Sequence, residues 1–331
     1  MPFMRRSMIF AAMVVPVALL STTASAAAPS PSPIQTVVAA PGPDGPLGGT
    51  MLSPDRDAPV VLMIPGSGPT DRDGNSPLGL KAATLKLLAE GLATHGIATV
   101  RVDKRGMYAS AGAIPDANAV TIGDYAKDVH SWIMSIRHMT DARCVWVLGH
   151  SEGGLVALSA AQDSTAICGL ILLATPGRPT DQTLAEQLRA NPANAPVLDQ
   201  ALAAISDLKA GRHVDVSQFH PALQRLFHPA IQDFLISEFA IDPAKLISTI
   251  HKPVLIVQGE RDMQVSVEDA HALKQADPAA KTVMLPDTNH VMKPVASADR
   301  RANLATYANP GLPLVPAVVP AIADFVLSVP R

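Results

Sequence analysis

The sequence predicts an α/β fold in which a mostly parallel sheet is covered by helices on both faces. Two observations support this. Several short runs are apolar at nearly every position, as expected for strands that are buried on both sides. Segments with helical spacing of apolar residues separate these runs, and that alternation is typical of parallel sheets with right-handed crossovers. Active sites in such sheets lie at the carboxyl ends of the strands.

The apolar runs place the strands. Six are predicted, at residues 60–64, 97–102, 145–148, 167–174, 254–258 and 282–285. The run 60–64 reads Val-Val-Leu-Met-Ile, and Pro65-Gly66 ends it. Residues 34–38 and 48–52 are candidates for a leading hairpin.

Helical periodicity places the segments between the strands. Leu85, Leu88 and Leu92 share one face of a helix predicted at residues 78–94, and Gly96 follows as a stop signal. By the same criterion, further helices are predicted at residues 121–139, 153–161, 267–275 and 317–327.

One block interrupts the alternation. Residues 177–250 contain helical patches but no convincing strand, so we expect a helical cap inserted into the core. The core is then made of residues 34–176 and 251–331. A Pro/Ser-rich leader is predicted at residues 27–33. No internal repeat is visible.

Residues 1–26 have the pattern of a secretory signal peptide. Arg5 and Arg6 provide the positive region, residues 8–20 are apolar, and residues 24–26 form a small-residue cleavage site. The apolar stretch is shorter than the about 20 residues that a membrane-spanning helix needs. We therefore expect a periplasmic or secreted protein without a stable membrane anchor after cleavage. The pattern leaves the general secretory and twin-arginine routes open.

Composition restricts the class of protein. Of 331 residues, 48% are hydrophobic and 17% charged, which is a globular composition. The formal net charge of −3 provides no electrostatic footprint for nucleic acid, so no such partner is expected. Two cysteines, Cys144 and Cys168, are too few for a disulfide scaffold or a four-cysteine zinc site. Each lies at the start of a predicted strand, which leaves open a disulfide or two buried thiols.

A candidate nucleophile follows the strand at residues 145–148. Gly149-His150-Ser151-Glu152-Gly153 has the form G-x-S-x-G between a strand and a helix. The glycines permit a sharp turn that exposes Ser151 in a strained conformation. The neighbouring His150 is expected to point elsewhere.

A serine hydroxyl needs a base, and the base needs a carboxylate that orients it. His290 follows the last predicted strand and is the candidate base. Asp262 follows the strand at residues 254–258 and is the candidate acid. Glu260 is its rival, and Asp287 is a weaker third. Ser151, Asp262 and His290 occur in the chain order Ser…Asp…His.

An oxyanion intermediate also needs hydrogen-bond donors. The backbone N–H of Glu152 is the first candidate. The second is expected in the loop after residues 60–64, where Ser67 is favoured and Gly68 is the alternative. Pro69 has no N–H. Asp71, Arg72 and Asp73 in the same loop are either ion-paired braces or exposed charges.

The loop 65–74, the segment 103–106, the elbow 149–154, Asp262 and His290 together resemble the α/β-hydrolase family. The loop Gly-Ser-Gly-Pro-x-Asp-Arg-Asp resembles that of bacterial serine esterases, although family members usually carry His-Gly where this chain has Pro65-Gly66. The resemblance implies an eight-stranded sheet, a helical cap after the sixth strand and ester hydrolysis through an acyl-enzyme. It also matches Arg105 to an arginine that is usually structural.

The resulting hypothesis is an exported serine carboxylesterase acting on small-molecule esters of short to medium acyl chains, without cofactor or metal. An aminopeptidase or amidase, a thioesterase or a lactonase would use the same triad. An aminopeptidase should provide acids for the substrate amine, for which Glu152, Asp207 and Asp215 are candidates. A non-catalytic binding protein on the same fold is the alternative from another class. The sequence does not indicate the oligomeric state.

Overall fold

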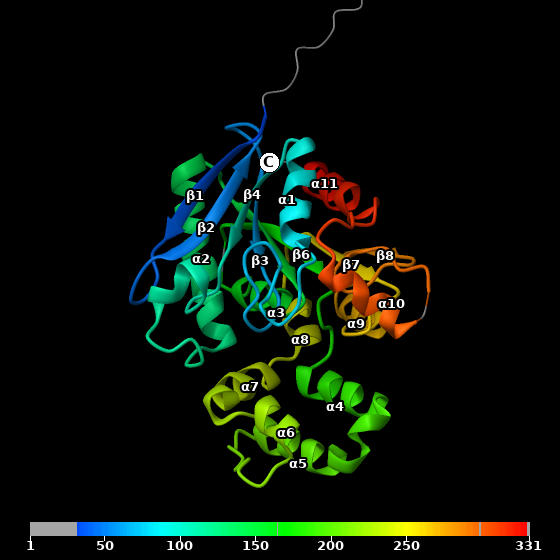
Figure 1. Ribbon diagram of the computed structural model, residues 1–331. Helices are drawn as coiled ribbons and strands as arrows, with labels where there is room; N and C mark the ends of the chain where they lie inside the picture. Colours follow the sequence, from blue (N-terminus) through cyan, green and yellow to red (C-terminus); the bar gives the residue numbers. More distant parts are fainter. Residues whose placement is uncertain (1–31, 164, 298, 330–331) are drawn as a thin grey trace, which may run out of the picture. The chain divides into compact units, whose positions relative to one another are not determined.

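The computed structural model describes residues 32–163, 165–297 and 299–329 (Figure 1). The predicted signal peptide and most of the predicted leader lie outside the described residues. Within those ranges, no helix combines the length and the apolar character needed to cross a bilayer.

One eight-stranded sheet forms the centre of the fold, in the order β1-β2-β4-β3-β5-β6-β7-β8. The first two strands form an antiparallel hairpin and β2 pairs antiparallel with β4, while all other pairs are parallel. The strands are β1 (Ile34–Ala40), β2 (Leu47–Ser53), β3 (Val60–Ile64), β4 (Ala98–Val102), β5 (Val145–His150), β6 (Ile167–Leu173), β7 (Val254–Gly259) and β8 (Lys281–Leu285). The predicted α/β class and the mostly parallel sheet are confirmed.

Helices cover both faces of this sheet. The α-helices are α1 (Thr84–Thr94), α2 (Ile122–Thr140), α3 (Glu152–Ala160), α4 (Thr180–Ala190), α5 (Leu198–Lys209), α6 (Pro221–Leu226), α7 (Gln232–Phe239), α8 (Pro243–Ser248), α9 (Val267–Ala276), α10 (Arg300–Ala305) and α11 (Val318–Ser328). The short 3₁₀ helices are η1 (Tyr108–Ala113), η2 (Pro192–Val197), η3 (Pro229–Ile231) and η4 (Thr306–Ala308).

The strand β3 shows how the two faces are divided. Val60, Leu62 and Ile64 join a core cluster with α2, α3, α8 and α9, whereas Val61 and Met63 join a second cluster with α1 and α11. Successive side chains of a strand point to opposite faces of the sheet. An entirely apolar strand therefore contributes side chains to the core on each face.

Local signals explain where helices differ from the prediction. The first helix begins at Thr84 instead of residue 78, because Gly79 and Ala83 have φ values of 101° and 52°, outside the right-handed helical region. The short helices α6, α8 and α10 were not predicted individually, since six residues are too few to show periodicity. Two of them begin with proline in the first turn, and the Asp242 and Asp299 side chains cap α8 and α10.

The block between β6 and β7 is helical. Its helices α4 to α7 share a core of their own, to which Leu208, Leu223, Phe227 and Phe239 contribute. Figure 1 shows these four helices grouped beyond α3 and α8. Their large apolar side chains are therefore used mainly to hold the cap together.

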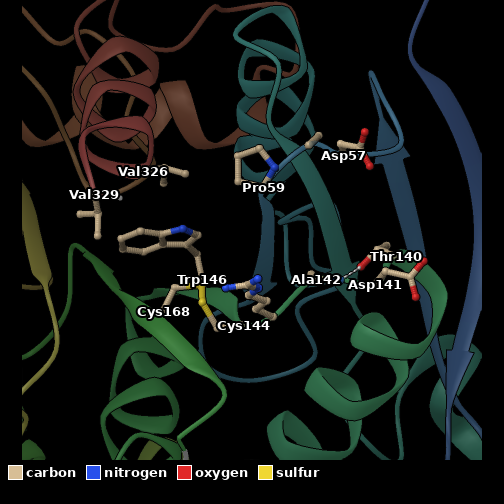
Figure 2. Close-up of a pocket in the computed structure, with 12 residues that line it drawn as sticks. Asp57, Pro59, Thr140, Asp141, Ala142, Cys144, Trp146, Cys168, Val326 and Val329 are labelled. Carbon is tan, nitrogen blue, oxygen red and sulfur yellow. Dashed lines mark hydrogen bonds between the residues drawn. A yellow bond between two sulfur atoms is a disulfide. The ribbon is translucent and has the colours of Figure 1, made fainter. Parts of the chain in front are cut away.

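A disulfide joins Cys144 and Cys168, whose Cα atoms lie 5.2 Å apart. Cys144 directly precedes β5, and Cys168 is the second residue of the neighbouring strand β6. The bond borders a cavity of about 520 Å³ at the amino ends of these strands, where Trp146 and Val329 also lie (Figure 2). This cavity is at the edge of the sheet opposite to the predicted catalytic residues.

Candidate active site

The turn between β5 and α3 holds Ser151 in a strained conformation. Its φ and ψ are 56° and −124°, and its N–H donates to the Leu173 carbonyl at 2.9 Å. An atom at the Cβ position of Gly149 would lie 2.1 Å from the Gly153 oxygen, and one at Gly153 would lie 2.5 Å from the Ile64 oxygen. Only glycine fits at these two positions, so the turn can pack against β3 while it presents Ser151.

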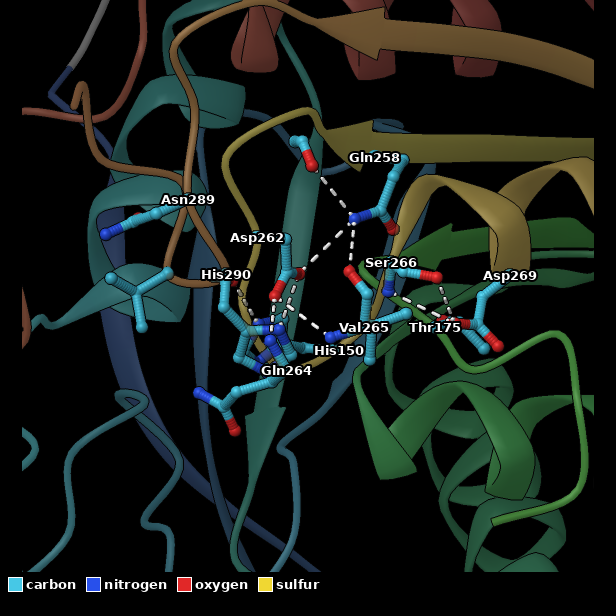
Figure 3. A network of polar contacts seen from close by, with 12 residues as sticks. His150, Thr175, Gln258, Asp262, Gln264, Val265, Ser266, Asp269, Asn289 and His290 are labelled. Atoms are coloured by element: carbon cyan, nitrogen blue, oxygen red, sulfur yellow. Dashed lines mark hydrogen bonds and ion pairs between the residues drawn. The ribbon is translucent and has the colours of Figure 1, made fainter. Parts of the chain in front are cut away.

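The Asp262 carboxylate binds His290 in a buried setting (Figure 3). The Asp262 Oδ2 to His290 Nδ1 distance is 2.7 Å, and the two side chains are 0% and 6% exposed. Asp262 Oδ1 accepts hydrogen bonds from the N–H groups of Gln264 at 2.7 Å and Val265 at 3.0 Å, and Gln258 Nε2 lies 3.3 Å from Oδ2. A carboxylate only accepts, so Nδ1 carries the proton and Nε2 of His290 is available as a base.

The rival acids lie elsewhere. Glu260 is exposed, and the Asp287 carboxylate is 3.3 Å from the Arg261 guanidinium. In the described part of the chain, neither carboxylate bonds to His290. The structure therefore brings Asp262, and not its rivals, to the candidate base.

His150 lies against His290, and among the described residues no hydrogen bond joins its ring to the Ser151 hydroxyl. The two ring centroids are 4.9 Å apart, and His150 Nε2 donates to the His290 carbonyl at 2.9 Å. Burial, and then the nearby His290, lower the pKa of His150 to about 4, so it is neutral at pH 7. The sequence did not indicate this contact, because it joins segments far apart in the chain.

Ser151 and His290 thus both adjoin His150, at the carboxyl ends of β5 and β8. Among the described residues, no hydrogen bond joins the Ser151 hydroxyl to His290. Such bonds are often long in unliganded sites and tighten when substrate binds.

The loop after β3 lies over the nucleophile. An atom at the Cβ position of Gly66 would lie 3.3 Å from Ser151 Cβ and 3.6 Å from His150 Nδ1. The Thr70 hydroxyl donates a hydrogen bond to the Ser67 carbonyl, and the Thr70 N–H donates one to the Gly68 carbonyl, both at 2.8 Å.

The candidate oxyanion donors are free to bind a ligand. Within residues 32–163, 165–297 and 299–329, the backbone N–H groups of Ser67, Gly68 and Glu152 donate no hydrogen bond. That of Glu152 is one of the orphan donors at the start of α3.

Ion pairs stabilise this loop. Two of its charged residues, Arg72 and Asp73, are therefore ion-paired braces and not simply exposed charges. Arg72 binds the buried Asp103, with Nε to Oδ2 at 3.1 Å and backbone N to Oδ1 at 2.9 Å. Asp73 pairs with the buried Arg101 on β4. Asp71 instead accepts hydrogen bonds from backbone N–H groups within the loop.

A family model and a related sequence match parts of this chain. A family model described as serine aminopeptidase, S33, matches residues 79–222. The esterase EstD of Thermotoga maritima is 28% identical over 240 residues, which are 71% of this chain and 54% of that protein. The chain thus spans about half the length of the curated relative it matches.

Solved structures share the fold. The esterase Pf2001 of Pyrococcus furiosus superposes with a TM-score of 0.54 at 14% identity, covering 89% of this chain and 92% of that one. Est1E from Butyrivibrio proteoclasticus superposes with a TM-score of 0.53 at 18% identity, covering 88% and 98%. At these identities the likeness concerns the fold. The chain has the α/β-hydrolase fold.

A buried ion pair lies beside the elbow, and the sequence analysis did not single it out. Lys104 Nζ lies 2.9 Å from Glu152 Oε1, and the two side chains are 3% and 4% exposed. Lys104 belongs to the segment 103–106, so the family motif was the signal that pointed to it. Its neighbour Arg105 forms a separate buried pair with Asp128, at 2.6 Å.

The cap contributes a carboxyl group next to this pair. Glu238 on α7 is buried, and its Oε1 lies 3.4 Å from the Thr180 hydroxyl. Burial, and then the negative charge of Glu152, raise the pKa of Glu238. Glu238 therefore keeps its proton at neutral pH.

A cavity of about 470 Å³ lies between the cap and the loop that carries Asp262. Gln187 on α4 and Arg178 are among its lining residues, and Gln187 donates to the Gln264 carbonyl at 2.7 Å.

In the described ranges, no group of three or more His, Cys, Asp or Glu side chains is placed to hold a metal ion.

Proposed function

We propose that this α/β-hydrolase is a serine carboxylesterase that cleaves small-molecule esters of short to medium acyl chains. The observation that carries the proposal is the buried hydrogen bond between Asp262 and His290, close to a serine held in a strained turn. The similarity to the esterase EstD supports the same class of reaction.

The proposed reaction uses the groups described above. Ser151 Oγ attacks the acyl carbon while His290 Nε2 takes its proton, and Asp262 stabilises the resulting imidazolium. His290 then passes the proton to the leaving alcohol. Water attacks the acyl-enzyme by the same route and releases the acid. The N–H groups of Ser67 and Glu152 bind the oxyanion of each tetrahedral intermediate.

The positions of the acids favour esters over aminopeptidase substrates. Glu152 is neutralised by Lys104. Asp207 pairs with Arg212 at 2.6 Å, and Asp215 is exposed. None of the three acids considered for a substrate amine is therefore both unpaired and buried beside Ser151. Thioesters and lactones would use the same triad and belong in the substrate panel.

Export is part of the proposal. Its support is the signal-peptide pattern of residues 1–26 together with the disulfide between Cys144 and Cys168, since disulfides persist in oxidising compartments. Expression of the full chain in a bacterial host, followed by fractionation and mass determination, tests it. Processed protein in the periplasm or medium is expected, and unprocessed protein in the cytoplasm would contradict export.

The deciding experiment is hydrolysis of p-nitrophenyl esters from acetate to laurate by the wild type and by Ser151→Ala. Alanine and proline p-nitroanilides, a thioester and a lactone are assayed in parallel. We expect turnover of the shorter esters that disappears in the variant, with little turnover of the anilides. Ser151-dependent cleavage of the anilides without ester cleavage would instead establish an aminopeptidase.

A further inference from the structure

We propose that Lys104 is a positioning residue that orients both backbone donors of the oxyanion hole. This inference rests on the proposed function, because it concerns the step in which the ester carbonyl becomes an oxyanion.

The Lys104 ammonium connects the two segments that supply these donors. Its Nζ donates to the Gly66 carbonyl at 2.8 Å and to Glu152 Oε1 at 2.9 Å. It also lies 5.3 Å from the centroid of the Tyr125 ring, a cation–π contact. A buried ammonium with an ion pair, a carbonyl and an aromatic ring around it is held in one place.

The bond to Gly66 sets the direction of the Ser67 N–H. The Gly66 carbonyl and the Ser67 N–H belong to the same peptide group, which is planar, and in a trans peptide they point in opposite directions. A carbonyl held by Lys104 therefore turns the N–H of Ser67 the other way. Charge at the carbonyl oxygen also polarises the group and strengthens the N–H as a donor.

The bond to Glu152 acts on the second donor. Glu152 is the first residue of α3, and its backbone N–H forms no hydrogen bond in the described residues. Its side chain is fixed by Lys104, which restrains the same residue that supplies this N–H. One ammonium group thus fixes the position of the loop after β3 relative to the start of α3.

Removal of Lys104 alone would mix two effects. It would release the Gly66 carbonyl, and it would leave Glu152 buried without its cation and close to Glu238. An uncompensated buried charge destabilises the fold. The variant Lys104→Met/Glu152→Gln separates the effects, because it removes the charge of both partners but does not restore the bond to Gly66.

The test measures kcat and KM on a p-nitrophenyl ester for the wild type, Ser151→Ala, Lys104→Met and Lys104→Met/Glu152→Gln. Arg105→Met/Asp128→Asn is the matched control, since it removes the adjacent buried ion pair, which does not touch the loop after β3. Thermal melting of each variant reports on stability. The affinity for a trifluoromethyl ketone, whose adduct carries an oxyanion, reports on the oxyanion hole.

We expect the double variant at Lys104 and Glu152 to melt at a higher temperature than Lys104→Met but to keep a kcat about 10²- to 10³-fold below the wild type, as for loss of one oxyanion donor. Its KM should stay within about threefold, because the oxyanion forms only after binding. The ketone affinity should fall in parallel with kcat/KM. The control should keep kcat within about threefold.

A folded Lys104→Met/Glu152→Gln variant with kcat within about tenfold of the wild type would overturn this inference alone, provided that Ser151→Ala is inactive. Equal activity of the wild type and Ser151→Ala would overturn the proposed function and the inference together. The two failures are thus distinguishable.

Discussion

His150 packs its ring against that of His290 and donates a hydrogen bond to the His290 backbone carbonyl at 2.9 Å. The residue before the candidate nucleophile thereby anchors the loop that carries the candidate base. A carbonyl accepts only, so Nε2 carries the proton of this bond, and the lowered pKa of His150 keeps the ring neutral at pH 7.

His150→Phe keeps an aromatic ring but removes this donor. We expect the free energy of unfolding at pH 8 to fall by about 1–3 kcal/mol, because the His290 carbonyl is left buried without its partner. Urea unfolding measures the change, with the exposed His95→Phe as control. A loss of less than about 0.5 kcal/mol would show that the bond contributes little.

The same variant predicts a pH dependence. The pKa of His150 is about 4 in the folded protein and near 6.5 in the unfolded chain. Between these values the unfolded chain binds a proton that the folded protein does not, so wild-type stability is lost as pH falls through this window. The stability advantage of the wild type over His150→Phe should shrink from pH 7 to pH 4. A constant difference would mean that His150 is not held neutral.

The triad predicts graded losses of activity. Ser151→Ala should fold normally and lose about 10⁶-fold in kcat, by analogy with other triads. Asp262→Asn should lose less, about 10⁴-fold, because it disturbs the tautomer of His290 and keeps the nucleophile. Steady-state kinetics on the best ester measures both. Glu260→Gln is the control and should keep the wild-type rate; if it loses activity while Asp262→Asn keeps it, the acid is wrongly assigned.

The buried carboxyl of Glu238 predicts a loss of stability as the pH rises from about 4.5 to about 8. Its pKa is near 4.5 in the unfolded chain and is raised to about 8 in the folded protein. Between these values the folded protein binds the extra proton, so wild-type stability falls as pH rises. Glu238→Gln cannot ionise, and its melting temperature should rise relative to the wild type from pH 5 to pH 9.

The control for Glu238 lies on another helix of the cap. Asp199 is exposed on α5 and forms no ion pair among the described residues, so Asp199→Asn should shift the melting temperature by a similar amount at every pH. Calorimetry of the three proteins across this range is the measurement. Parallel curves for the wild type and Glu238→Gln would argue against a protonated Glu238.

Removal of the disulfide is expected to lower the free energy of unfolding without lowering kcat. Cys144 and Cys168 are 24 residues apart in sequence. Closing a loop of this size stabilises the fold by about 3 kcal/mol in the chain-entropy model. Cys144→Ser/Cys168→Ser should lose about this amount in urea unfolding and keep the wild-type kcat while folded, because the bond lies at the amino ends of β5 and β6. Wild-type protein treated with a reductant should behave in the same way.

The sequence predicts those features of the fold that depend on residues close together in the chain, and it misses those that depend on contacts between distant segments. Apolar runs such as residues 60–64 indicated buried strands, because burial on both faces leaves a local signature. The glycines of the elbow indicated a sharp turn for the same reason. The helices α6, α8 and α10 escaped individual prediction, since each is set by caps and prolines over six residues and by packing.

By itself, the sequence determined the α/β class, the order of the elements, and the candidates Ser151, Asp262 and His290, each placed after a strand. Tertiary structure alone decided which distant groups meet: Asp262 with His290 in place of Glu260, His150 with the His290 carbonyl, and Lys104 with Gly66 and Glu152. The physical reason is that hydrogen bonds and ion pairs act over a few ångströms. Which groups come that close is set by the packing of the whole sheet and its helices.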